Sequence, residues 1–133
     1  MSEENLELAR QAYAAWNRGD LDWHLNHMTA DFEFWPGLGF SDMDDVYRGK
    51  TGWRRFAATW RDAWEDVTVR VERIEEVDDR IVALLTFDAK GRGSGVEVSL
   101  QVGQVATVRE GKVAKLVSAP SWDEALKAAG LLE

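Results

Sequence analysis

One side chain in this sequence suits proton transfer near neutral pH, and it is His24. In the stretch LDWHLNHM, His24 shares a helix face with Leu21, Leu25 and Met28. Imidazole is the side chain whose unperturbed pKa fits general base catalysis in this range. His24 is therefore the candidate base, and the alternative is a histidine that packs in the core or caps a helix. His27 projects from roughly the opposite side and is expected in solvent.

A second candidate for chemistry is Gln104, in a strand expected over residues 96–109. The even positions of this strand are apolar except for Gln104, whereas the odd positions are mostly polar. The even face should therefore point into the protein. A buried amide without partners costs about 1–3 kcal/mol, so Gln104 must bond to protein, water or a ligand. Facing a ligand, it would donate to an oxygen that gains negative charge.

Other kinds of site find little support in the sequence. The absence of cysteine excludes disulfides, a thiolate nucleophile and Cys-ligated metals. No serine has a histidine partner at a recognisable spacing. The loop that carries Asp42, Asp44 and Asp45 lacks the spacing of a calcium loop, so we interpret it as a solvated acidic loop. We expect neither a metal nor a cofactor.

Aromatic residues are concentrated in the segment GWRRFAATWRDAWEDV, residues 52–67. Trp53, Phe56, Trp60 and Trp64 follow one another at spacings of 3, 4 and 4, which predicts one helix with an aromatic stripe. Such rings serve either as core or as the wall of a ligand site. We expect Phe56 and Trp64 to fill the core and Trp53 and Trp60 to contact a ligand. The full set of expected ligand contacts is Tyr13, Trp16, Phe34, Trp35, Trp53, Trp60, Phe87 and Ser118.

The elements that must position these side chains follow from hydrophobic periodicity and turn residues. Helices are expected over 3–17 and 21–28, a strand over 31–35, the aromatic helix, four further strands from Val67 to 120, and a short helix over 121–130. Gly19, Asp20 and Ser121 supply helix stop and start signals. The order predicts an α+β fold with an antiparallel sheet and helices on one face, as a single domain spanning residues 1–133.

The strand RIVALLTFDA, residues 80–89, is apolar on both of its faces. A strand of this kind needs cover on both sides of the sheet. Helices supply one cover, and a second subunit would supply the other. We therefore predict a homodimer through the outer face of the sheet.

Charge and hydropathy set limits on partners and location. The formal net charge is −8 and the isoelectric point is near 4.8, which argues against nucleic acid. The sequence has no apolar run near 18 residues, so we expect no membrane span. The acidic, amphipathic start MSEENLELARQ does not resemble a secretory signal, which favours a cytoplasmic location.

Four stretches together resemble a known superfamily and cover most of the chain in the right order: RQAYAAWNRGDLDWHLNHMTADFEFW, VYRGKTGWRRF, VREGKV and WDEALKAAGL. The pattern resembles the nuclear-transport-factor-2-like, or cystatin-like cone, fold, and within it the SnoaL-like proteins. The resemblance implies a curved sheet that forms a cone, closed by the helices over an internal cavity. It also implies relatives such as polyketide cyclases, ketosteroid isomerases and dehydratases, and it makes the loop 37–51 a candidate lid.

Steroid isomerase chemistry does not transfer to this sequence. Aligned by eye with ketosteroid isomerases, Gln104 stands where they carry an acidic donor, and Trp35 stands where they carry the aspartate base. Their tyrosine falls at Ala12, one residue before Tyr13. Tryptophan cannot abstract a proton, and glutamine cannot supply the proton of a carboxylic acid.

The leading hypothesis is a protein that binds a small apolar or aromatic molecule in an internal cavity. Cofactor-free acid–base chemistry of the isomerase, cyclase or dehydratase type is a further option there, with His24 as base and Gln104 as donor; whether the protein is an enzyme stays open. The alternative is a non-enzymatic dimeric binding or assembly module whose tryptophans fill the cone. An empty pocket on the order of several hundred cubic ångströms favours the ligand, and a closed cone favours the module.

Overall fold

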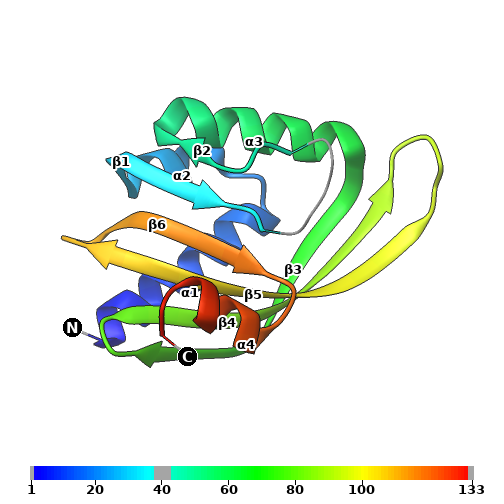
Figure 1. The fold of residues 1–133 in the computed structure, drawn as a ribbon. Helices are drawn as coiled ribbons and strands as arrows, with labels where there is room; N and C mark the ends of the chain where they lie inside the picture. Colours follow the sequence, from blue (N-terminus) through cyan, green and yellow to red (C-terminus); the bar gives the residue numbers. More distant parts are fainter. Residues whose placement is uncertain (1, 38–42, 132–133) are drawn as a thin grey trace.

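The computed structural model describes residues 2–37 and 43–131, which fold into four helices and six strands (Figure 1). The helices are α1 (Ser2–Asn17), α2 (Leu21–Asn26), α3 (Gly49–Ala63) and α4 (Trp122–Ala128). The strands are β1 (Met28–Trp35), β2 (Tyr47–Arg48), β3 (Trp64–Val77), β4 (Arg80–Gly91), β5 (Glu97–Arg109) and β6 (Lys112–Ala119). No helix in the described ranges has the length and apolar character needed to cross a membrane.

All six strands form a single sheet in the order β2-β1-β6-β5-β4-β3. Every neighbouring pair is antiparallel except β1 and β6, which run parallel. The sheet curls around α1, α2 and α3, and this arrangement confirms the expected α+β cone (Figure 1). The parallel pair corrects the expectation of an antiparallel sheet. It arises because β1 comes first in the chain and pairs with the last strand, so no hairpin fixes its direction.

The turn between α1 and α2 forms as the sequence predicts. Gly19 adopts a positive φ of 72° after the end of α1, a conformation that glycine adopts without steric cost. The Asp20 carboxylate then accepts a hydrogen bond from the backbone N–H of Trp23 and caps α2. These local signals set the angle at which α2 presents His24 to the interior.

The aromatic helix is one residue shorter than its stripe indicates. Trp64 has extended dihedrals (φ −132°, ψ 145°) and is the first residue of β3, so its place on the helix was predicted wrongly. Its ring still lies 5.9 Å from that of Trp60. The helical period continued into the strand because no glycine or proline marks the boundary.

The loop between β1 and α3 contains the short strand β2, which the sequence analysis missed. Two residues are too few to show an alternating pattern, but Tyr47 and Arg48 pair with Phe34 and Glu33 of β1. The Tyr47 side chain is buried, and its hydroxyl accepts a hydrogen bond from the backbone N–H of Asp44. The lid expected in this loop falls partly on residues 38–42, which lie outside the described residues.

The outer face of the sheet has a cover that the sequence analysis did not place there. The helix α4 packs on this face, where Val82 of β4 (0% exposed) and Val105 of β5 contact Ala125 of α4. Helices therefore cover both faces of the sheet, and the expectation of helices on one face alone was wrong. The homodimer through the outer face stays a prediction, but α4 already buries part of the apolar surface on which it was based.

A glycine in β5 permits this close approach of α4. A Cβ built on Gly103 would lie 2.2 Å from the backbone oxygen of Ser121 and 3.0 Å from the Cβ of Ala125. No side chain fits in that space, so the chain leaves β6 and crosses β5 at the one position without a Cβ.

We predict that Gly103→Ala lowers the free energy of unfolding by about 1–3 kcal/mol, the usual cost of overpacking. The added methyl group would displace α4 from the sheet. Thermal and urea unfolding followed by circular dichroism test this. Gly93→Ala is the control for backbone strain alone, since Gly93 has a positive φ but nothing within 4 Å of the point that a Cβ would occupy. An unchanged stability in Gly103→Ala would contradict the role assigned to this glycine.

Candidate functional site

An internal cavity of about 110 Å³ lies between α1, α2 and α3 and the concave face of the sheet. Nearly all of its lining is apolar. Nine of the residues expected to act or bind line it: Tyr13, Trp16, His24, Phe34, Trp53, Trp60, Phe87, Gln104 and Ser118. The structure thus brings together side chains from both N-terminal helices, the aromatic helix and four strands.

Trp35 is the expected ligand contact that does not line this cavity. Strand alternation turns Phe34 inward and Trp35 to the other face of β1. The Trp35 indole donates to the Glu33 carboxylate (3.0 Å), and the Lys115 ammonium lies 5.8 Å from its ring. The sequence placed both aromatic residues at the site because the inward face of a short strand cannot be read without its register.

Three polar side chains form a hydrogen-bonded chain across the cavity wall. The Tyr13 hydroxyl donates to Oε1 of Gln104 (2.9 Å), and Nε2 of Gln104 donates to Oγ of Ser118 (2.9 Å). Gln104 is 7% exposed and Ser118 3% exposed. Burial raises the pKa of Tyr13 above its usual value, so its hydroxyl stays protonated at neutral pH. The counterpart of the isomerase tyrosine was expected at Ala12, but the side chain that reaches Gln104 is Tyr13.

This chain leaves a hydroxyl hydrogen for a ligand. The amide of Gln104 joins two hydroxyl groups, and it accepts from one while donating to the other. The hydroxyl that accepts keeps its own hydrogen, and in the observed arrangement this is the hydroxyl of Ser118. If the amide turned over, the free hydrogen would belong to Tyr13. In either arrangement the chain presents a hydroxyl donor to a hydrogen-bond acceptor in the cavity.

His24 ties three helices together with its two ring nitrogens. Nε2 lies 2.9 Å from the backbone oxygen of Ala12 in α1 and donates to it, since a carbonyl can only accept. Nδ1 then accepts from the indole N–H of Trp53 in α3, at 3.3 Å. Burial is the main cause that lowers the pKa of His24, which is therefore neutral at pH 7. His24 is thus packed between helices with both ring nitrogens bonded, and its side chain also lines the cavity.

His27 does not lie free in solvent as expected. Its ring stacks on Trp23 with 3.9 Å between centroids, and its Nδ1 bonds to the Trp23 backbone oxygen at 2.7 Å. Both residues also line the cavity. The helical wheel missed this because His27 follows the last residue of α2, where the wheel no longer applies.

The aromatic rings from α3 form most of the cavity wall on the helix side. Phe56 packs edge-on against Phe34 (4.7 Å between centroids), and Trp60 against Phe87 (5.4 Å). Phe56, which we assigned to the core, lines the cavity as well, whereas Trp64 does not. The sequence analysis missed further lining residues: Leu8, Ala9, Ala12, Trp23, His27, Met28, Phe32, Pro36, Met43, Phe56, Val69, Leu85, Val102, Ala106, Val108, Val113 and Leu116. Three of these, Val102, Ala106 and Val108, lie on the even face of β5 that the sequence already predicted to point inward.

Among the described residues that line the cavity there is no aspartate, glutamate, lysine or arginine. Acidic groups near it pair with arginines at the surface instead, as in Glu33 with Arg48 and Asp44 with Arg55. Within residues 2–37 and 43–131, no three histidine, aspartate or glutamate side chains gather in a way that suits a metal ion. The cavity of the described structure is thus uncharged and largely apolar, with the Tyr13–Gln104–Ser118 chain and the His24–Trp53 hydrogen bond in its wall.

Comparison with known proteins gives a family match. The sequence model of the family described as SnoaL-like domain matches residues 9–116, which is most of the chain. A search of curated proteins finds no match.

Solved structures share the fold at low sequence identity. The crystal structure of TerC, co-crystallised with polyporic acid, is 20% identical, with a TM-score of 0.77 over 93% of this chain and 98% of that one. An NTF2-like protein of unknown function from Burkholderia pseudomallei is 18% identical (TM-score 0.79; 96% and 97% covered). A protein from Catenulispora acidiphila with a ketosteroid isomerase-like fold, in complex with trimethylamine, is 14% identical (TM-score 0.74; 94% and 93% covered). These likenesses show the nuclear-transport-factor-2-like fold.

The hydrogen bonds of His24 predict a dependence of stability on pH. The pKa of His24 is lower in the folded than in the unfolded protein, so the unfolded state takes up a proton first as the pH falls. The stability due to neutral His24 is complete above the unfolded pKa, near 6.5, and is lost as the pH falls toward the folded value. The loss cannot exceed about 1.4 kcal/mol for each pH unit. Urea unfolding of wild type and His24→Gln between pH 8 and pH 5 measures it, and parallel curves would contradict the prediction.

Replacement of the central amide tests the hydrogen-bonded chain. Gln104→Leu keeps a similar volume but leaves the hydroxyls of Tyr13 and Ser118 without the amide. We expect a loss of about 1–3 kcal/mol in the free energy of unfolding. The double variant Tyr13→Phe/Gln104→Leu should recover part of this loss, because it removes one of the stranded hydroxyls. Equal stability of Gln104→Leu and wild type in urea unfolding would show that the chain contributes nothing to the fold.

Proposed function

The chain belongs to the family of SnoaL-like domains, and on that premise we propose that it binds a neutral, ring-sized molecule in its internal cavity. The observation that carries the proposal is an apolar cavity with the hydrogen-bonding chain Tyr13–Gln104–Ser118 in its wall. The ligand therefore combines an apolar ring with a hydrogen-bond acceptor such as a carbonyl oxygen.

The volume of the cavity limits the size of the ligand. An apolar cavity of about 150 Å³ holds one benzene ring. The cavity here measures about 110 Å³, so a single ring is the upper limit unless side chains move. This is smaller than the pocket that we expected for a ligand-binding cone, because the tryptophans and Phe56 occupy much of the interior. It is nevertheless not a closed core, which supports a ligand over a self-filled module.

The charge of the lining supports a neutral ligand. The two titratable groups with shifted pKa values in the cavity, Tyr13 and His24, are both shifted toward their neutral forms. An ion would lose its hydration without gaining a partner of opposite charge. Two structural relatives were crystallised with small molecules, polyporic acid and trimethylamine, which agrees with a binding role for this fold.

A matched pair of probes tests this proposal. Benzaldehyde carries a carbonyl acceptor, and toluene has a similar ring without it. We expect both to bind, with benzaldehyde about threefold to tenfold tighter because of one added hydrogen bond. The change in tryptophan fluorescence and isothermal titration calorimetry measure the two affinities.

Two variants serve as controls for the binding test. Tyr13→Phe/Ser118→Ala removes both hydroxyl donors of the chain, so it should remove the preference for benzaldehyde and leave toluene binding in place. Val102→Phe should fill the cavity and abolish both, since Val102 is fully buried in the lining. Absence of binding to wild type would contradict the proposal and favour the non-enzymatic assembly module.

A second candidate function is cofactor-free proton transfer on a ketone held in the same cavity. The observation that favours it is the long 3.3 Å hydrogen bond from Trp53 to Nδ1 of His24, which leaves the lone pair of a neutral imidazole weakly engaged. His24 would take the proton from the carbon next to the carbonyl, and the electrons of that C–H bond would move onto the oxygen. The Gln104 amide, with its two hydroxyls, would stabilise this oxygen.

Deuterium exchange into cyclohexanone tests the proton transfer. In D₂O the wild-type protein should speed exchange next to the carbonyl, as followed by NMR, and His24→Gln should lose this activity. Trp53→Phe is the second variant to compare. It removes the hydrogen bond to Nδ1 of His24 and should keep or raise the exchange rate. Exchange that is unchanged in His24→Gln would exclude His24 as the base, while leaving the binding proposal intact.

A further inference from the structure

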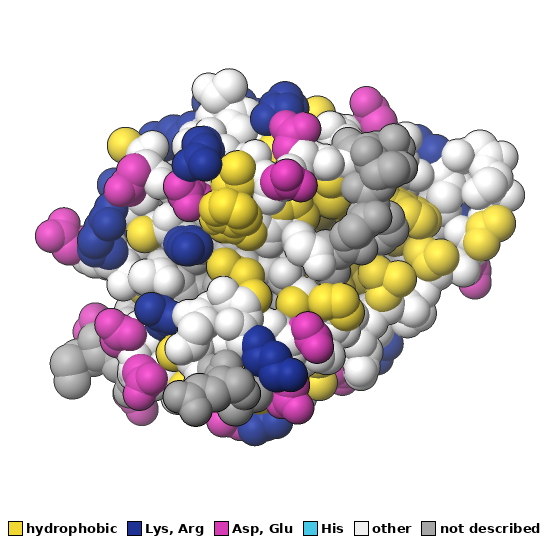
Figure 2. Space-filling view, in the orientation of Figure 1, with side chains coloured by type: hydrophobic (Ala, Val, Ile, Leu, Met, Phe, Trp, Pro, Cys, Tyr) yellow, Lys and Arg dark blue, Asp and Glu magenta, His cyan; other side chains and the backbone are white. Residues whose placement is uncertain are grey.

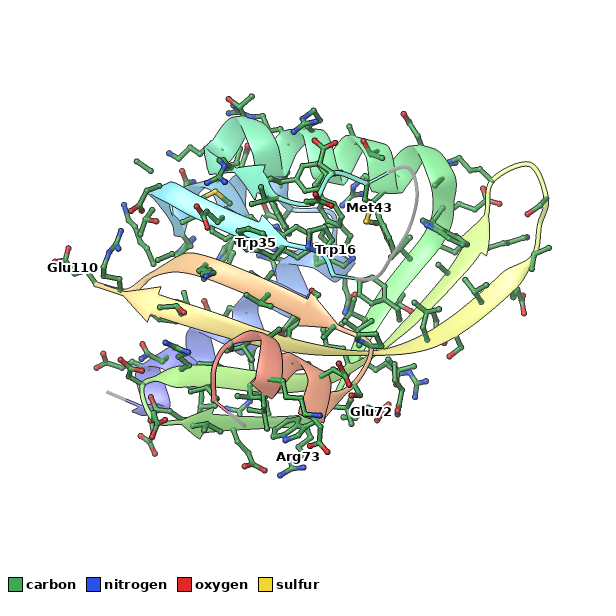
Figure 3. All side chains as sticks on the ribbon, viewed as in Figure 1. Trp16, Trp35, Met43, Glu72, Arg73 and Glu110 are labelled. Carbon is green, nitrogen blue, oxygen red and sulfur yellow. The ribbon has the colours of Figure 1, made fainter. Side chains whose placement is uncertain are left out.

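Strand β5 extends well beyond its neighbour β6, and this leaves part of its edge open. β6 pairs with β5 from Gly103 to Arg109, whereas residues 97–102 pair with β4 only. Figure 1 shows the β4–β5 hairpin projecting past the end of β6. At its other end, β5 is joined to β6 by a tight turn that contains Glu110. This turn lies at the end of the sheet opposite the β4–β5 hairpin (Figure 3).

The hydrogen-bonding direction along β5 follows from its pairing with β4. The N–H of Gly91 donates to the backbone oxygen of Val96 at 2.8 Å, so one hydrogen bond joins this opposed pair and the Val96 oxygen faces β4. In an antiparallel ladder such pairs alternate, so the even-numbered residues Val98 and Leu100 turn their backbone groups toward β4. The N–H and C=O groups of Glu97, Ser99 and Gln101 therefore face the open edge.

The side chains beside this edge are apolar on one face. Val96 is 58% exposed, and the other exposed large hydrophobic residue of the described structure, Val71, is 37% exposed. Val98 and Leu100 follow on the same face and are half-buried. Figure 2 shows hydrophobic side chains at the surface where the hairpin projects. An open edge with apolar neighbours is a template for another strand, and the segment 97–101 has no proline or lysine to block it.

We propose that the open edge of β5 pairs with the same edge of a second copy of this chain, antiparallel about a two-fold axis at Ser99. In this register Ser99 faces Ser99 of the other copy, and Glu97 faces Gln101. Val98 then lies beside Leu100, and the apolar faces of the two hairpins become continuous. The interface is isologous, as closed dimers require.

Hydrogen bonds and charge select this register. It pairs the outward backbone groups of Glu97, Ser99 and Gln101 on both copies. A shift centred on Glu97 would place two carboxylates opposite each other, which is destabilising. A shift centred on Gln101 would run the second copy into the part of β5 that β6 already occupies. Of the registers centred on a residue whose backbone faces the edge, the one at Ser99 avoids both conflicts.

This contact differs from a dimer through the outer face of the sheet. On that face α4 covers Val82, and the neighbouring surface carries ion pairs of Arg70 with Glu72 and with Asp88. Arg73 also lies over the ring of Trp122, 3.8 Å from its centroid. Glu72 and Arg73 lie beside α4 in Figure 3. These groups have partners within the chain, whereas the outward backbone groups of Glu97, Ser99 and Gln101 have none among the described residues.

A proline at the centre of the edge tests the contact. Ser99→Pro removes an N–H that β4 does not use, and proline is tolerated in edge strands where the N–H faces outward. Ser99→Ala loses the same hydroxyl and keeps the N–H, so it is the matched control. By light scattering at micromolar concentrations, wild type and Ser99→Ala should show twice the 15.0 kDa mass of one chain. Ser99→Pro should show the mass of one chain with an unchanged circular dichroism spectrum.

Cross-linking tests the register independently, since the native chain has no cysteine. A hydrogen-bonded antiparallel pair has Cα atoms about 5.5 Å apart, within the roughly 4.4–6.8 Å that a disulfide spans. Ser99→Cys should therefore form a covalent dimer on mild oxidation. Gln101→Cys should not, because four residues of offset separate its two copies by about 13 Å.

Three results would overturn the proposal. A single-chain mass for wild type throughout the concentration range would remove the dimer altogether. A Ser99→Pro protein that keeps the double mass would place the contact elsewhere, with the outer face of the sheet as the next site to test. Cross-linking that is equal for Ser99→Cys and Gln101→Cys would reject the register.

Discussion

The packing of α3 against the concave face of the sheet is the constraint on which the rest of the structure depends. Trp53, Phe56 and Trp60 are buried and face the strands. Large rigid rings bury much apolar area, and they also leave gaps that no small side chain fills. The same packing therefore stabilises the cone and leaves the cavity of about 110 Å³ in it. Fold stability and the size of the cavity have one origin in this protein.

The few polar groups inside the cone are held by contacts that join separate elements. His24 connects α2 to α1 and α3, and Gln104 connects β5 to α1 and β6. Each would destabilise the fold if left without partners, because a buried amide or imidazole loses its bonds to water. Satisfying these groups also fixes the direction in which they point from the cavity wall. A structural and a functional role of His24 are therefore compatible.

The two faces and the edge of the sheet differ in how completely the chain covers them. The concave face has α1 to α3, and the outer face has α4, which approaches closely at Gly103. The chain leaves the sheet at that glycine, so β6 ends there and the rest of β5 stays unpaired on one side. One glycine thus determines both the cover of the outer face and the open edge of the hairpin.

The sequence by itself determined the elements, because periodicity, capping residues and turns act over a few residues. It predicted the helices, the inward face of β5 with Gln104, and most of the aromatic residues of the cavity. Tertiary structure decided what depends on distant pairing: the parallel contact of β1 with β6, the outward turn of Trp35, and the position of α4. It also selected Tyr13 rather than Ala12 as the partner of Gln104, since 91 residues separate the two along the chain. A local pattern holds no information about such contacts, which form only when the sheet closes around the helices.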